Sequence, residues 1–248
     1  MRAIYILWLR QIKRYIRSRS RIVGAVGQPL LFLLALGYGL GSIYKAAGRG
    51  DYLQFLVPGI MAQTVLFSSM FYGAMIIFDK QFGFLKETLV VPVSRFKIML
   101  GGALGGATTS VIQGSLVFFI SLAIGFRPHN WLMAIVALAF MSVLALAITG
   151  FSSGIGSFVE DMQGFQAINQ FLVFPLYFLS GALYPLNHVP TWLRIIAEIN
   201  PISYTVDALR WSLLGTTKFG LGPDMLAMAI TLVVMLSFGA IRFRYIEA

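Results

Sequence analysis

Six long stretches of the chain contain no aspartate, glutamate, lysine or arginine: Ile22–Tyr44, Tyr52–Phe78, Ile98–Phe126, Asn130–Val159, Met162–Thr191 and Met225–Ile241. A helix needs about 20 apolar residues to cross the hydrocarbon core of a bilayer, and every stretch but the last exceeds that length. A soluble domain keeps roughly a quarter of its residues charged, whereas here only 11% are charged. We therefore predict an all-α membrane protein with six transmembrane helices, folded as one domain over residues 1–248.

The 19 lysines and arginines are distributed unequally between the two sides of this domain. Most of them precede the first span, lie between the second and third spans, or follow the last span. Short segments rich in lysine and arginine stay in the cytoplasm, so we expect both termini there, in a multi-pass protein of the cell (cytoplasmic or inner) membrane. The same asymmetry accounts for the net charge of +10. We therefore expect the lipid bilayer, and no nucleic acid, as the partner of these cations.

Residues 1–21 form an amphipathic pattern. Tyr5, Trp8, Ile12, Tyr15 and Ile16 recur at helical spacing, and the basic residues fall on the opposite side. This pattern is typical of a helix that lies in the cytoplasmic interface with its apolar side toward the membrane. A disordered basic leader remains the alternative.

The six spans lack the ionisable side chains that chemistry at membrane depth requires. Ion-coupled transporters usually bury a carboxylate, lysine or histidine there, and intramembrane enzymes need a buried base or metal ligand. The two histidines, His129 and His188, lie in connections beside prolines, and the chain has no cysteine. We therefore expect a chain that is not an enzyme, holds no cofactor or metal, and takes any energy for transport from elsewhere.

A glycine-rich segment, Gly101–Gly106, has a spacing that resembles a phosphate-binding loop. It lacks the lysine that would contact the phosphates, and it opens an apolar span. We interpret these glycines, like Gly150 and Gly154, as sites of close helix packing.

Uncharged polar residues also occur inside the spans, and they are costly in lipid unless they face another helix or a polar cavity. They are Gln28, Gln63, Thr64, Gln113, Asn169 and Gln170. From this set we select Gln63, Thr64, Asn169 and Gln170 as candidates for a substrate path, with interhelical hydrogen bonding as the alternative. Pro29, Pro58 and Pro175 mark positions where the spans are expected to kink.

The connection between the second and third spans, residues 79–97, is too long for a turn. Apolar residues at helical spacing and a following proline predict a short amphipathic helix on the cytoplasmic side. Such a helix can dock into the groove of a partner protein, and an interfacial loop is the alternative. The residues that define it are Gly83, Phe84, Leu85, Lys86, Glu87, Leu89, Pro92 and Arg95.

The connection between the fifth and sixth spans is apolar although it lies on the outer side. Within residues 188–215 two amphipathic segments are separated by Pro201 and ended by Gly215, and each is too short and too charged to span. We predict two re-entrant or interfacial helices, in which Asp207 and Arg210, three residues apart, are placed to pair. The residues that define this region are Pro190, Trp192, Asn200, Pro201, Tyr204, Asp207 and Arg210.

Two sequence segments resemble a known protein family. Gly83-Phe-Leu-Lys-Glu-Thr-Leu-Val-Val-Pro-Val-Ser-Arg95 resembles the cytoplasmic coupling helix of ABC-2-type exporter permeases. Pro175-Leu-Tyr-Phe-Leu-Ser-Gly-Ala-Leu-Tyr-Pro185, with Trp192 and Asn200–Arg210 after it, resembles the fifth span and outer helices of the same family. The subgroup is similar to daunorubicin-type drug, nodulation-factor and polysaccharide export permeases. The triplet Asp79-Lys80-Gln81 departs from the family, where a denser cluster of acids and arginines is common.

The resemblance implies a transmembrane subunit that exports an amphiphilic drug, lipid or lipid-linked glycan. It implies a permease dimer, homo- or heteromeric, and two copies of a separate ATPase subunit that bind ATP and Mg at the cytoplasmic face. Phe84, Leu85 and Leu89 would then be the docking residues, with Lys86, Glu87 and Arg95 fixing the register. An ATP-independent channel or facilitator and a membrane scaffold remain the alternatives.

Overall fold

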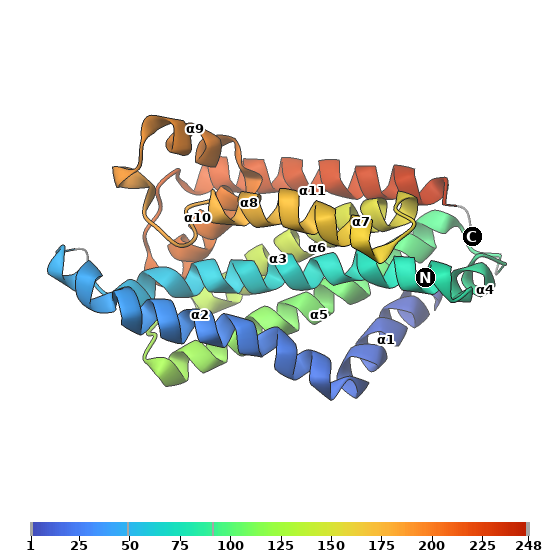
Figure 1. The fold of residues 1–248 in the computed structure, drawn as a ribbon, viewed down its shortest axis with the longest axis horizontal. Helices are drawn as coiled ribbons and strands as arrows, with labels where there is room; N and C mark the ends of the chain where they lie inside the picture. Colours follow the sequence, from blue (N-terminus) through green and yellow to red (C-terminus); the bar gives the residue numbers. More distant parts are fainter. Residues whose placement is uncertain (1, 49, 91, 247–248) are drawn as a thin grey trace.

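The computed structural model describes residues 2–48, 50–90 and 92–246, without the side chains of residues 19–21, 25, 89 and 188. Within these ranges every regular element is a helix, which confirms the prediction of an all-α protein, and the long helices pack side by side (Figure 1). In chain order the elements are α1 (Arg2–Arg17), α2 (Arg19–Ala46), α3 (Tyr52–Gln81), α4 (Phe84–Val90), α5 (Arg95–Ile124), α6 (Met133–Phe158), α7 (Met162–Ile168), η1 (Asn169–Val173), α8 (Phe174–Phe178), η2 (Leu186–His188), α9 (Thr191–Ile199), α10 (Pro201–Leu214) and α11 (Leu221–Arg244).

Five of the described helices are long and apolar enough to cross a membrane: α2 from Ile22, α3, α5, α6 and α11. They coincide with five of the six charge-free stretches. In the most apolar part of each helix, 83% of the residues of α3 are buried, against 18% for α2 and 17% for α11. Helix α3 is therefore the centre of the bundle, and α2 and α11 lie at its outside.

The fifth charge-free stretch, Met162–Thr191, is longer than the helix that it contains. The chain is helical from α7 through η1 to α8, but it leaves the helix after Phe178. In η1 the Phe174 N–H donates to the Asn169 carbonyl five residues back, immediately before Pro175, which has no N–H to donate. After α8 the chain turns at Gly181, whose φ is +74°. The apolar composition continues through this turn, so composition alone overestimates the length of the helix.

Small residues let the helices approach closely, as the sequence predicts. On α6, Gly150 and Gly154 face α11, where a Cβ on Gly239 would collide with the carbonyl of Gly150. Between α3 and α6 the Ser152 hydroxyl accepts from the Gly73 N–H at 2.7 Å and donates to the Met70 carbonyl at 2.6 Å. Close backbone contact of this kind stabilises helix pairs in a membrane, where apolar burial alone contributes little.

Helix α1 packs against α5, which the interfacial prediction did not include. Gly101 and Gly105, one turn apart on α5, lie against α1 so closely that added Cβ atoms would crowd its residues. The Trp8 Nε1–H donates to the Thr108 hydroxyl at 3.0 Å. Tyr5 and Ile16 stay exposed, so protein covers only part of the apolar face of α1.

The two ends of the bundle differ (Figure 1). One end holds α4 and both chain termini, and we call it the α4 end. The opposite end holds α9, and α10 is buried next to it between α3, α6 and α11. Pro201 occupies the first turn of α10, and Gly215, with φ at +72°, ends that helix as the sequence predicts.

Candidate functional site

Helix α4 is held on the bundle by Leu85. It starts directly after Gly83, whose φ of +78° turns the chain out of α3, and Pro92 follows shortly after its end. The Leu85 side chain is 5% exposed. It belongs to a cluster of buried residues from α3, α5 and the end of α11, here called the α4 cluster: Tyr72, Ile76, Leu85, Ile98, Met99, Ala103, Phe243 and Ile246. A displacement of α4 therefore acts on three long helices.

The opposite face of α4 is uncovered. Phe84 is 51% exposed, and Lys86, Glu87 and Val90 are exposed as well. Three of the residues that the sequence assigned to partner contact therefore point outward, whereas Leu85 points into the chain and serves as an anchor. The side chain of Leu89 lies outside what the structure describes.

Arg95 contacts its own chain. Its Nη1 donates to the Arg244 carbonyl at 2.7 Å and to the Ile246 carbonyl at 3.0 Å. These bonds fasten the start of α5 to the last turn of α11, where a cation also meets the negative end of the helix dipole. The position that the resemblance assigned to register with a partner thus has a structural function within this chain.

The Asp79-Lys80-Gln81 triplet is occupied by contacts within the chain. The Asp79 carboxylate lies 3.4 Å from Nη1 of Arg14 and 3.8 Å from Nη2 of Arg10, and so joins the end of α3 to α1. The Lys80 ammonium donates to the Ser157 carbonyl at 2.9 Å, at the C-terminal end of α6. Sequence patterns did not indicate this link, although the spacing of Arg10 and Arg14 puts both on one side of α1.

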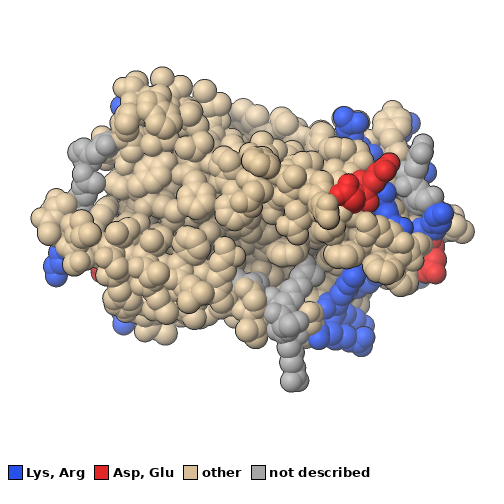
Figure 2. Space-filling view, viewed as in Figure 1, with Lys and Arg blue, Asp and Glu red and all other residues tan. Residues whose placement is uncertain are grey.

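Charge on the surface is concentrated at the α4 end. On the face drawn in Figure 2, most of the described lysine and arginine side chains gather there, around α1 and α4, and none of those drawn in blue lies over the middle of the bundle. An uncharged belt between a cationic end and a weakly charged one is the surface expected of a protein that sits across a bilayer.

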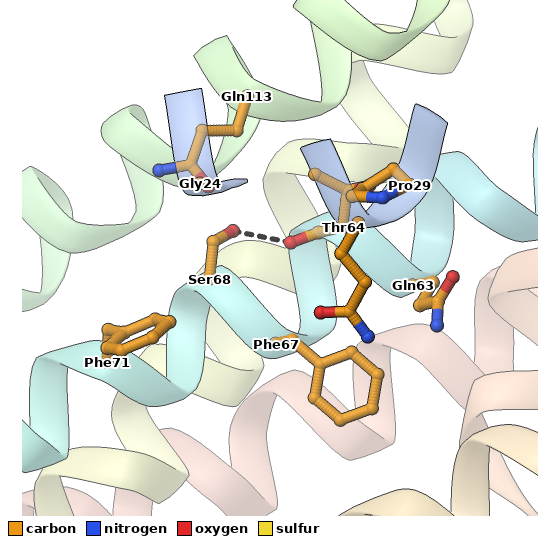
Figure 3. Close-up of a pocket in the computed structure, with 9 residues that line it drawn as sticks. Gly24, Pro29, Gln63, Thr64, Phe67, Ser68, Phe71 and Gln113 are labelled. Atoms are coloured by element: carbon orange, nitrogen blue, oxygen red, sulfur yellow. Dashed lines mark hydrogen bonds between the residues drawn. The ribbon is translucent and has the colours of Figure 1, made fainter. Parts of the chain in front are cut away.

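A cavity of about 230 Å³ lies between α2, α3 and α5 (Figure 3). Its apolar wall includes Pro29 on α2, and Phe67 and Phe71 on α3. Its polar lining consists of three amides and two hydroxyls: Gln28, Gln63, Thr64, Ser68 and Gln113. No lysine, arginine, histidine, aspartate or glutamate is among the described residues that line it.

The predicted path residues divide into two groups. Gln63 and Thr64 line the cavity, whereas Asn169 and Gln170 belong to η1 and do not. Asn169 keeps a buried Oδ1 without a hydrogen-bond partner, and Gln170 is exposed. Gln28 and Gln113 line the cavity although they were outside the selected set. The sequence showed that both are polar residues inside spans, but it did not show which spans are neighbours.

At the α9 end, Asp207 and Arg210 do not form the expected pair. The Asp207 carboxylate accepts from the backbone N–H groups of Lys218 and Phe219 and from the Thr217 hydroxyl, and so shapes the turn before α11. The Arg210 guanidinium donates to the carbonyls of Gly181 and Ala182 and lies 3.8 Å from the centre of the Phe55 ring.

The other residues of this region cap and connect helices. The Asn200 side chain accepts from the Ile202 N–H and donates to the Leu176 carbonyl, so it joins α10 to α8. Tyr204 donates to the Glu198 carbonyl of α9. Pro190 precedes α9, and Trp192 in its first turn is exposed.

A family model described as ABC-2 type transporter matches residues 2–214. The inner membrane transport permease YadH of Escherichia coli is 26% identical, over 99% of this chain and 94% of the relative. The daunorubicin resistance ABC transporter permease protein DrrB1 of Streptomyces coeruleorubidus is 26% identical, over 80% of this chain and 70% of the relative. Nodulation protein J of Rhizobium leguminosarum bv. trifolii is 24% identical, over 98% and 91%. These matches confirm the resemblance found in the sequence.

Proposed function

The chain belongs to the ABC-2 type transporter family, and on that premise we propose that it is the membrane-spanning subunit of an ATP-driven exporter. In this proposal it moves an amphiphilic drug, lipid or lipid-linked glycan out of the cytoplasm or the inner leaflet. It catalyses no covalent chemistry. A separate ATPase subunit binds ATP and Mg, and two copies of it act on a dimer of permease chains, homo- or heteromeric.

The proposal places the α4 end in the cytoplasm and counts six spans. The gathering of lysine and arginine at that end supports this orientation. The sixth span, fifth in chain order, is the continuous helix of α7, η1 and α8, which at 1.5 Å per residue is about 25 Å long. This is short for a bilayer of about 30 Å, so we assign the remaining depth to the turn at Gly181 and to α9 and α10.

The observation that carries the proposal is the two-sided construction of α4. One side is anchored in the α4 cluster by Leu85, and the other presents Phe84 and Glu87 to the surroundings. A helix built this way receives a push from a docked partner and passes it to α3, α5 and α11. The middle turns of α3, α5, α6 and α11 carry no charged residue, which also favours a soluble energy source. The one buried carboxylate of α11, Asp224, lies in its first turn, at the α9 end.

Isolation of the tagged full-length chain from its native membrane tests the proposal. We expect a stoichiometric ATPase with a phosphate-binding loop to co-purify. Phe84→Ala and Glu87→Ala should uncouple transport from ATP hydrolysis while membrane insertion stays intact. Unchanged substrate-stimulated ATPase activity in both variants would exclude the coupling assignment. Transport by the purified chain alone would favour the channel or facilitator alternative, and a pure inactive chain would favour a scaffold.

A further inference from the structure

Four of the six uncharged polar residues that the sequence places inside spans converge on one cavity. Gln28 comes from α2, Gln63 and Thr64 from α3, and Gln113 from α5. The three helices that carry them are separate in the sequence, and the polar residues of each helix could have faced a different neighbour. Polar side chains are costly in an apolar environment, so their arrangement around one cavity indicates that a ligand there hydrogen-bonds to them.

Three amide atoms of the two buried glutamines, Gln63 and Gln113, have no hydrogen-bond partner in the described protein. Gln63 is 2% exposed, and neither its Oε1 nor its Nε2 has a hydrogen-bond partner. Gln113 is 3% exposed, and its Oε1 has none. A rotation that turns the Gln63 amide into the cavity therefore breaks no hydrogen bond in the protein. A ligand there would gain donors and acceptors that are already desolvated.

The hydroxyl groups contribute differently. Thr64 donates to the Ile60 carbonyl at 2.9 Å, and Ser68 donates to the Thr64 carbonyl at 2.6 Å (Figure 3). Their hydrogens are used within α3, and their oxygen lone pairs remain. The cavity therefore offers acceptors from hydroxyls and both donors and acceptors from carboxamides.

We propose that this cavity binds the uncharged, hydroxyl- or amide-bearing head group of the exported amphiphile, an inference that rests on the function proposed above. Among the described lining residues, a cationic head would lose its hydration without meeting a carboxylate, and an anionic head would meet no lysine or arginine. A neutral head that both donates and accepts matches the carboxamides. Phe67 and Phe71 supply flat apolar surface beside it.

The size and opening of the cavity restrict the ligand further. Its volume is about 230 Å³. It is below the ~300–1,000 Å³ of pockets that enclose a whole drug-sized ligand. Gly24 and Gln28 in its wall are exposed on the thinly covered helix α2. The head group alone therefore enters between the helices, and the apolar remainder stays in the lipid beside α2.

Photolabelling of the full-length chain in liposomes tests this inference without ATP or the ATPase. Three probes share one acyl chain with a diazirine and differ only in the head: glucosyl, trimethylammonium or phosphate. We expect the glucosyl probe to label the wild-type chain at about tenfold lower mole fraction than either charged probe. In the Gln63→Met, Gln113→Met double variant this preference should fall about tenfold, since each lost hydrogen bond weakens binding a few-fold.

Two further variants make the result decisive. Gln170→Met makes the same change at an exposed position outside the cavity and should leave labelling unchanged. Gln28→Lys adds a cation at the exposed mouth and should strengthen labelling by the phosphate probe. The inference would be overturned if a charged probe labelled the wild type as strongly as the glucosyl probe or more strongly, or if the double variant kept the wild-type preference. It would also be overturned if Gln170→Met lost as much labelling as the double variant, or if Gln28→Lys gained no labelling by the phosphate probe. Because no ATPase is present, these outcomes are independent of whether the exporter assignment holds.

Discussion

Truncation of Phe84 to alanine separates the two sides of α4. Phe84 is 51% exposed in the single chain, whereas its neighbour Leu85 is 5% exposed and anchors the helix. A phenylalanine side chain offers ~200 Å² of surface, so about 100 Å² of Phe84 is available to a docked partner. At ~25 cal/mol per Å², burial of that surface contributes about 2.5 kcal/mol, of which alanine retains a small part. A loss of about 2 kcal/mol corresponds to an affinity for the ATPase about thirtyfold weaker.

The assay is a titration of the isolated ATPase subunit onto the chain in lipid nanodiscs, with the dissociation constant as the readout. The thermal unfolding midpoint of the variant should stay close to that of the wild type, because a truncated exposed side chain changes stability by about 0.5 kcal/mol or less. Leu85→Ala provides the contrast. It removes a buried anchor, so it should lower stability by about 2–5 kcal/mol as well as weaken coupling.

Phe119→Ala is the matched control for Phe84→Ala. Phe119 is also exposed, but it lies in the last turns of α5, toward the end of that helix remote from α4. The Phe119→Ala variant should bind the ATPase with the affinity of the wild type. Undiminished affinity in Phe84→Ala, or an equal loss in Phe119→Ala, would show that α4 is not the docking surface.

Three more predictions address the packing and the internal ties. Gly239→Ala should lower the thermal midpoint because the new Cβ collides with α6, whereas Gly222→Ala, in the same helix with open space around it, should leave the midpoint unchanged or slightly raised. Asp79→Asn removes the partner of two half-exposed arginines, so it should cost about 1 kcal/mol or less and appear as faster amide exchange in α1, without global destabilisation. Asp207→Ala leaves three donors of the turn before α11 without their acceptor, and cleavage between residues 215 and 221 by a nonspecific protease should become faster than in wild type.

The spans that the sequence predicted best are those whose composition and structure are both set by the cost of placing a charged side chain in hydrocarbon. A charged side chain is expensive in hydrocarbon, so α3, α5, α6 and α11 are free of charge through their middle turns. Charge does not define where a helix ends. The stretch from Met162 stays apolar through Gly181 because the turn there is covered by protein, and no charge marks the end of α8.

At the candidate site, too, the sequence predicted the element but not the contacts of its side chains. The pattern from Gly83 to Pro92 predicted a short amphipathic helix, but periodicity could not tell which apolar residue faces the chain and which faces outward. Leu85 and Phe84 are adjacent and equally apolar, and only the position of the α4 cluster distinguishes them. The sequence also assigned Arg95 to register with a partner and Asp207 to a pair with Arg210. Arg95 instead bonds to backbone carbonyls about 150 residues later, and Asp207 to backbone N–H groups beyond the end of its own helix, and helical periodicity contains neither contact.

The positions of α4 and the cavity determine which helix can move. Helix α3 carries Gln63 and Thr64 on the cavity and Tyr72 in the α4 cluster, eight residues or about 12 Å from Thr64. It is packed on several sides, so a push from α4 displaces it as a rigid rod rather than bending it. Helix α2 has few contacts to hold it, and it continues from α1, which Asp79 joins to the end of α3. On the proposed function we therefore expect the cavity to open at the wall formed by α2, because this helix is the least buried of the three that line the cavity.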